Sequence, residues 1–203
     1  MMIKSKLGLL TALAVVFNLF NANAKGEGEN MSKNLVVYFS RTGEQYSVGN
    51  ITEGNTAVVA KMIAKEINAD LFEIKLQNDT YPQGYKALTE AALAEKKANA
   101  RPEIVGEVAN FAEYDTIFIG APNWWADLPM PVYTFLEKYN WSGKKIAPFV
   151  THEGSGLSSI PSKIKATTGA EMLDGLEMYG HIAQNSREDA LAKVQTWLKK
   201  IGF

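Results

Sequence analysis

Hydrophobic residues in this chain gather in short runs that predict strands. Continuous apolar runs, typical of parallel strands covered on both faces, occupy 35–39, 116–121 and 145–150. A partly alternating stretch at 71–76 and a segment near 171–179 predict two further strands. The chain therefore has five candidate strands, well separated along the sequence.

Segments with helical spacing lie between these strands. Val59, Met62, Ile63 and Ile67 form one apolar stripe of a helix that should start at Asn55-Thr56. The other predicted helices cover 85–98, 131–138, about 157–167 and a C-terminal segment with Leu191, Val194, Leu198 and Ile201 on one side. Alternating strands and helices predict an α/β fold with a doubly wound parallel sheet. A ligand in such a sheet binds at the carboxyl ends of the strands, where the strand order reverses.

The N-terminal segment has the layout of a secretory signal peptide. Lys4 and Lys6 precede an apolar run at 7–20, and small residues follow at Ala22 and Ala24. A membrane anchor is the alternative, but this run is shorter than the ~20 residues that a spanning helix needs. We therefore expect a signal peptide at 1–24, a linker at 25–33 and a folded domain at 34–203. The exported protein would be periplasmic or secreted, with no membrane anchor after cleavage.

Composition narrows the range of functions. A chain of 203 residues that is 46% hydrophobic suits a single globular domain, and a formal charge of −1 argues against nucleic acid as a partner. The chain has no cysteine and only two histidines. Disulfides, thiol catalysis and a Cys- or His-rich metal site are therefore not expected.

Three unusual segments follow the first, third and fourth predicted strands. These segments are Ser40-Arg41-Thr42-Gly43 with Asn55-Thr56, then Pro122-Asn123-Trp124-Trp125, then Thr151-His152-Glu153-Gly154-Ser155-Gly156. A strand that leads through a hydroxyl-bearing loop to a helix start favours anion binding, because the first helical turn has free N–H groups. Taken alone, the first segment could equally be a polar turn with a threonine N-cap. The carboxyl ends of parallel strands meet at one edge, so all three segments should lie together.

The order and spacing of these motifs resemble those of flavodoxins, in particular the short-chain flavodoxin-like proteins with a Trp-Trp flavin loop. The resemblance covers about 34–203. It implies a five-stranded parallel sheet with strand order 2-1-3-4-5. It also implies non-covalent FMN at the switch point between the first and third strands.

The resemblance assigns a part of FMN to each of the three segments. Hydroxyl and amide groups of the first segment would hold the phosphate, with Arg41 as either a charge-assisted contact or a solvated surface residue. We expect one tryptophan of the second segment to stack on the flavin ring and the other to serve in packing. Small residues of the third segment would approach the polar edge of the ring. The candidate cofactor-binding residues are Ser40, Arg41, Thr42, Asn55, Thr56, Pro122, Asn123, Trp124, Trp125, Thr151, Glu153, Gly154, Ser155 and Gly156.

Three features depart from the flavodoxin pattern. An insert at 44–54 interrupts the phosphate loop, and either it bulges outward or Tyr46 folds over the flavin as a lid. The segment after the fourth strand lacks a stacking tyrosine, which favours an open flavin face. The segment after the third strand lacks glycine, and a bulky residue there makes a positive φ costly. His152 is expected to be structural or hydrogen-bonding, with an acid/base role as the alternative.

These observations lead to three functional hypotheses. The first is an exported FMN-binding redox protein that passes electrons between redox partner proteins and needs no catalytic side chain of its own. The second is an FMN-dependent NAD(P)H:quinone oxidoreductase that acts on small quinone-like acceptors. The third is a flavodoxin fold without flavin that serves as a binding module.

Overall fold

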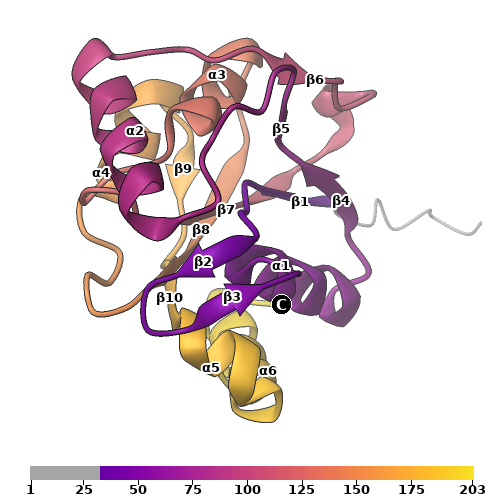
Figure 1. Ribbon diagram of the computed structural model, residues 1–203. Coiled ribbons are helices and arrows are strands. Elements are labelled where there is room, and N and C mark those ends of the chain that lie inside the picture. The colour runs from indigo at the N-terminus through magenta and orange to yellow at the C-terminus, as the bar shows by residue number, and fades with distance from the viewer. Residues whose placement is uncertain (1–32) are drawn as a thin grey trace, which may run out of the picture. The chain divides into compact units, whose positions relative to one another are not determined.

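The computed structural model describes residues 33–203; the predicted signal peptide and linker residues 25–32 lie outside them. Figure 1 shows a central sheet in which all neighbouring strands are parallel. Its strands are, in spatial order, β4 (Asp70–Glu73), β1 (Asn34–Tyr38), β7 (Thr116–Pro122), β8 (Lys145–His152) and β10 (Leu176–Tyr179). This order is the predicted 2-1-3-4-5, and the α/β fold class is confirmed.

Helices cover both faces of the sheet, which explains why β1 is apolar without alternation. Leu35 and Val37 contribute to the core on one face and Val36 and Tyr38 to the core on the other. The first face is covered by α2 (Tyr85–Ala98), α3 (Met130–Lys138) and α4 (Ile160–Thr168). The second is covered by α1 (Asn55–Glu66), α5 (Gly180–Asn185) and α6 (Arg187–Ile201).

The fifth predicted strand is split, because β8 contains a proline. The structure has β9 (Glu171–Met172) in addition to β10, and both pair with β8. The amide of Leu173 donates to the carbonyl of Ile146 at 2.8 Å. Pro148 lies two residues further along β8. Proline has no N–H to donate, so the ladder is interrupted there.

The second predicted strand is also divided. The β4 strand ends at Glu73, and β5 (Lys75–Leu76) then pairs antiparallel with β6 (Ile104–Val105) instead of continuing in the central sheet. A short 3₁₀ helix, η1 (Phe111–Glu113), precedes β7. The remaining predicted elements agree with the structure to within a few residues.

The insert at 44–54 takes part in a β-hairpin. Its strands are β2 (Gly43–Gln45) and β3 (Gly49–Ile51), which pair antiparallel. The amide of Glu44 donates to the carbonyl of Gln83 at 3.0 Å, and a carboxylate oxygen of Glu44 accepts the amide of Tyr85 at 2.9 Å. The hairpin is therefore bound to the start of α2, beside which it lies in Figure 1.

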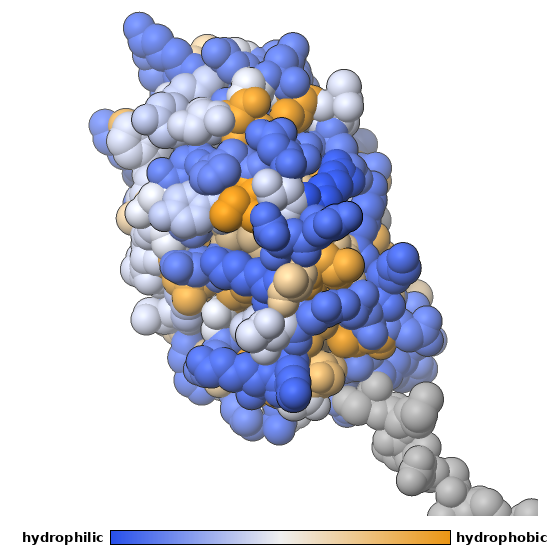
Figure 2. Space-filling model, turned by 90° about the horizontal axis from the view of Figure 1, so that it is seen from below, coloured by the Kyte–Doolittle hydropathy of each residue, from blue (hydrophilic) through white to orange (hydrophobic). Residues whose placement is uncertain are grey.

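The molecular surface gives no sign of an extended apolar face in the view of Figure 2. That view shows a mainly hydrophilic surface on which hydrophobic residues form small separate groups. Among the helices within residues 33–203, none has both the length and the apolar character needed to cross a membrane.

Candidate functional site

A cavity of about 280 Å³ lies where the strand order reverses, at the carboxyl ends of β1, β7 and β8. All three predicted segments contribute to its wall. The predicted binding residues that line it are Ser40, Arg41, Asn55, Thr56, Pro122, Asn123, Trp124, Thr151, Glu153 and Ser155. The other four, Thr42, Trp125, Gly154 and Gly156, do not line this cavity.

The first turn of α1 forms one end of the cavity. Ser40, directly after the β1 run, accepts the amide of Ala57 at 3.0 Å through its hydroxyl oxygen. Gly54 precedes the helix and supplies no side-chain cap. Within residues 33–203, the amides of Asn55 and Thr56 donate to no protein acceptor. Two N–H groups with the positive end of the helix dipole are thus available to an anion.

Arg41 is held by the protein rather than exposed to solvent. Its guanidinium pairs with Asp79, donates to the carbonyl of Tyr81 at 3.3 Å and lies over the Tyr81 ring. Only 9% of its side chain is exposed, so the alternative of a solvated surface arginine was wrong. Thr42 is exposed and lines a different cavity, to which Ser40 also contributes and Thr56 does not.

Two hydroxyl groups join α1 to β8 beneath the cavity. The hydroxyls of Thr56 and Thr151 lie 2.7 Å apart, and both residues are buried. Asn55 accepts a hydrogen bond from the side chain of Gln184 on α5 at 3.0 Å. These contacts fix the start of α1 against the third segment of the site and against α5.

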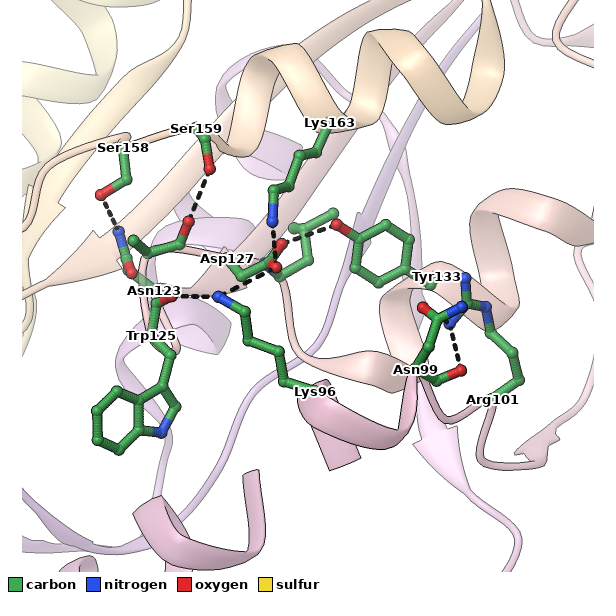
Figure 3. A network of polar contacts seen from close by, with 12 residues as sticks. Lys96, Asn99, Arg101, Asn123, Trp125, Asp127, Tyr133, Ser158, Ser159 and Lys163 are labelled. Carbon is green, nitrogen blue, oxygen red and sulfur yellow. Dashed lines mark hydrogen bonds and ion pairs between the residues drawn. The ribbon is translucent and has the colours of Figure 1, made fainter. Parts of the chain in front are cut away.

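Asn123 connects the segments after β7 and β8. Its backbone amide donates to the carbonyl of Thr151, and its side-chain amide donates to Gly156 O and Ser158 Oγ, each at 2.9 Å. Figure 3 shows the contact with Ser158. Gly156 has a φ of 59°, in the left-handed region that glycine adopts more readily than other residues. Gly156 therefore shapes the segment without lining the cavity.

The two tryptophans lie in different environments. Trp124 is partly buried and packs edge-on against Phe39 and Tyr81, with ring centroids 5.6 and 5.4 Å away. Trp125 is 49% exposed and turns onto α2, where its indole N–H donates to the carbonyl of Thr89 at 2.9 Å. Trp124 thus faces the cavity, and Trp125 borders a second cavity beside it.

Trp125 and Ala126 form a tight turn with positive φ. Trp124 and Asp127 exchange two backbone hydrogen bonds of 3.0 and 3.1 Å, and both central residues have φ of 57°. This pattern is that of a type I′ turn, which ordinarily uses Asn and Gly. The absence of glycine therefore does not prevent positive φ here, although each such residue costs about 1–2 kcal/mol.

A buried ionic network holds this turn (Figure 3). The carboxylate of Asp127 pairs with Lys163 and with Lys96 at 3.3 Å, and it accepts the Tyr133 hydroxyl at 2.7 Å. Lys96 also donates to the carbonyl of Trp125 at 2.6 Å. Burial opposes ionisation of Asp127, but the hydrogen bonds that its carboxylate accepts from Lys163, Tyr133 and the Leu128 amide outweigh it and lower the carboxyl pKa.

His152 is buried at the end of β8. Its Nδ1 accepts the amide of Gly154 at 2.9 Å, so the proton of the neutral ring is on Nε2. That Nε2 is buried and has no hydrogen-bond partner within residues 33–203. Burial lowers the pKa of His152, which favours the neutral ring. The ring is therefore a donor without an acceptor, at the wall of the cavity.

Glu153 points toward the start of α5. Its carboxylate accepts the amide of His181 at 2.8 Å, and its other oxygen lies 2.7 Å from Nδ1 of His181. Glu153 thus orients the third segment, and its side chain is only 14% exposed.

Sequence reasoning missed part of the cavity wall. Gln45 and Tyr85 line it, and so do Tyr46, expected only as a possible lid, and His152, expected to be structural or hydrogen-bonding. The rings of Tyr46 and Tyr85 lie 5.6 Å apart at 31°. Tyr85 was taken for the first residue of an exposed helix.

The fold and the cavity together define a doubly wound α/β protein with a ligand site at the strand-order reversal. A family model described as flavodoxin matches residues 33–201. The chain therefore belongs to the flavodoxin family.

Solved structures with the same fold include two proteins from Bacteroides that carry provisional flavoprotein assignments. The one from Bacteroides eggerthii is 25% identical with a TM-score of 0.65, and the match covers 85% of this chain and 99% of that one. The one from Bacteroides uniformis is 28% identical with a TM-score of 0.63, covering 83% and 98%. A flavoprotein from Lactobacillus acidophilus NCFM, solved in complex with FMN, is 24% identical with a TM-score of 0.60, covering 79% and 99%. A comparison with curated protein sequences gives no match.

Proposed function

We propose that this protein is an FMN-binding redox protein that carries out electron transfer after export from the cytoplasm. The observation that carries the proposal is the cavity at the strand-order reversal, to which all three predicted segments contribute. Family membership and the FMN complex of the Lactobacillus acidophilus protein support it.

The α1 end of the cavity fits a phosphate. The amides of Asn55 and Thr56, which have no acceptor within residues 33–203, are hydrogen-bond donors at the positive end of a helix of 12 residues. The hydroxyl of Ser40 accepts the Ala57 amide and can still donate its own proton. Arg41 lines the cavity but is already paired with Asp79, so we assign it to anchoring the loop.

The other end of the cavity fits a flat ring with acceptors on its edge. Trp124 offers an aromatic wall, and the polar residues Asn123, Thr151 and Ser155 line the same cavity. When bound, FMN supplies the reversible electron transfer. The residues of this chain bind it, orient its ring and exclude water; none of them has to move a proton.

Incorporation of FMN tests this proposal directly. The mature domain, refolded with excess FMN and then separated from free cofactor, should retain a flavin absorption spectrum and quench flavin fluorescence. A colourless protein that ignores added FMN would instead favour a flavin-free binding module.

Export rests on the sequence of the N-terminal segment. Lys4 and Lys6, the apolar run at 7–20 and the small residues before Lys25 support a cleaved signal peptide. Expression of the full chain in a bacterium, followed by intact-mass analysis of the periplasmic fraction, should give a product that begins at Lys25. A product of full length that stays in the cytoplasm would contradict this part of the proposal.

A second candidate function is that of an FMN-dependent NAD(P)H:quinone oxidoreductase. It is favoured by a second cavity that adjoins the first one through shared wall residues. Steady oxidation of NADH or NADPH in the presence of a quinone would support it. A flavin-loaded protein that turns over neither nucleotide would leave the role of electron carrier between redox partner proteins.

A further inference from the structure

A second cavity of about 250 Å³ lies between α2 and the tryptophan turn. It shares Gln45, Tyr85, Asn123 and Trp124 with the first cavity, so the two are neighbours along a common wall. Its own part of the wall comes from α2 and from Trp125. Small-molecule sites are concave and mostly apolar, and they span roughly 300–1,000 Å³ for drug-sized ligands. This cavity is therefore of a size for a molecule of one or two rings.

The lining of this cavity is partly aromatic and uncharged, with neutral polar groups from Gln45, Thr89 and Asn123. Leu88 and Ala92 of α2 supply an apolar floor, and Tyr85, Trp124 and Trp125 supply aromatic walls. None of its lining residues carries a charge. The nearby charges of Lys96 and Asp127 are paired with each other at 3.3 Å. Such a lining favours a planar, neutral ligand and disfavours an ion, whose desolvation nothing would offset.

Trp125, which forms the outer wall of the second cavity, is held in place although it is exposed. Trp125 is 49% exposed, yet its indole N–H is bonded to the carbonyl of Thr89 and its own carbonyl accepts Lys96. Its backbone has a positive φ, which costs free energy. Trp125 is therefore strained and fixed, with 49% of its surface exposed. Strain of this kind is found at ligand sites.

We propose that this second cavity, formed by α2 and the Trp125 turn, binds an uncharged planar aromatic molecule next to the flavin cavity. The inference deepens the proposed function, and rests on it only for the identity of the neighbouring ligand. The binding itself depends on the apolar floor at Ala92 and on the Trp125 ring. Because the chain has no cysteine, a quinone can serve as a probe without reacting with a thiol.

Calorimetric titration of the mature protein with 1,4-naphthoquinone, with and without FMN, tests the inference. The oxidised protein should bind this probe, and 1,4-naphthoquinone-2-sulfonate should bind at least about tenfold more weakly because of its charge. Ala92→Leu fills the floor and should weaken naphthoquinone binding at least about tenfold, with FMN affinity changed less than about twofold. Ala94→Leu adds the same bulk at an exposed position of α2 and should change neither affinity. If Ala92→Leu does not fold, Trp125→Ala removes the outer wall instead and should weaken naphthoquinone binding to a similar extent.

The outcomes separate this inference from the proposed function. A protein that binds FMN but not naphthoquinone, or binds the sulfonate as well as the neutral quinone, would overturn the inference and leave the proposed function intact. A loss of FMN binding in Ala92→Leu would also overturn it, because the second cavity would then be part of the flavin site. Naphthoquinone binding to a protein that ignores FMN would overturn the proposed function and support the inference.

Discussion

Gly54 lies where the first loop meets α1, and there is no space for a side chain beside it. A Cβ at this position would be 2.1 Å from the Ser40 hydroxyl and 2.5 Å from the Arg41 carbonyl. Gly54→Ala must therefore displace the loop that carries the proposed phosphate contacts. We expect FMN affinity to fall at least about tenfold, as measured by fluorescence quenching.

Gly84 offers a matched control for that substitution. It also precedes a helix in extended conformation, but a Cβ there would meet its nearest neighbour, a Glu44 oxygen, at an ordinary 3.7 Å. Gly84→Ala should leave FMN affinity within about twofold. Equal effects of the two substitutions would mean that the loss of glycine, not the crowding at Ser40, governs binding.

Ala126 has a conformation that glycine adopts more easily. Its φ of 57° is in the left-handed region, and its side chain is exposed, so little packing would be lost on substitution. Ala126→Gly should raise the free energy of unfolding by about 1 kcal/mol, as measured by urea denaturation. Ala94→Gly, at an exposed position within α2, should lower it by about 1 kcal/mol. Destabilisation by both substitutions would show that the turn is not strained.

The buried ring of His152 makes stability depend on pH. Burial lowers its pKa below the ordinary 6.5, so below that pH the unfolded chain binds a proton that the folded protein excludes. The free energy of unfolding should therefore fall as the pH drops below 6.5. His152→Gln removes this contribution, so its stability should fall less than that of the wild type between pH 7.5 and 5.5. Parallel loss in both proteins would show that His152 is not the group responsible.

At the scale of elements, the β2–β3 hairpin adds an aromatic wall to the flavodoxin fold. Tyr46 is 59% exposed but lies against Tyr85 and lines the first cavity. Aromatic pairs contribute about 0.5–1.5 kcal/mol beyond area burial. Tyr46→Ala should thus weaken FMN binding about two- to tenfold, with a nearly unchanged urea midpoint. Asn50→Ala, on the exposed partner strand, is the control, and unchanged FMN affinity in both would make the hairpin a bystander.

The sequence predicted the elements well where the apolar pattern was long and continuous. The runs that became β1, β7 and β8 were found because strands buried on both faces need apolar residues at every position. The breaks in the second and fifth predicted strands were missed. They depend on what the neighbouring strand offers, such as Pro148 without its N–H, and not on the broken segment itself.

The sequence predicted which segments lie together at the cavity, but it did not predict the contacts that individual side chains make there. Spacing after three strands was enough to place Ser40, Trp124 and Thr151 at one cavity. It could not show that Arg41 is committed to Asp79, because that pairing joins loops 38 residues apart. Nor could it show that Trp125 turns onto α2, since the ionic network of Asp127 decides this.

At the scale of the whole molecule, the parallel sheet brings three distant segments to one edge. The carboxyl ends of β1, β7 and β8 meet where the strand order reverses, and α1 begins at the same edge. The insert and the tryptophan turn add residues to this shared frame, and both border the second cavity. In the proposed function, this frame would hold a phosphate at one end of the cavity and a ring at the other.

The most direct test of the proposed FMN site compares the affinity of the protein for FMN with its affinity for riboflavin, which lacks the phosphate. Calorimetric titration of the mature domain should show that FMN binds at least about tenfold more tightly than riboflavin, because the free amides at the start of α1 and the Ser40 hydroxyl hold the phosphate. Equal affinity for the two ligands, or binding of neither, would contradict it.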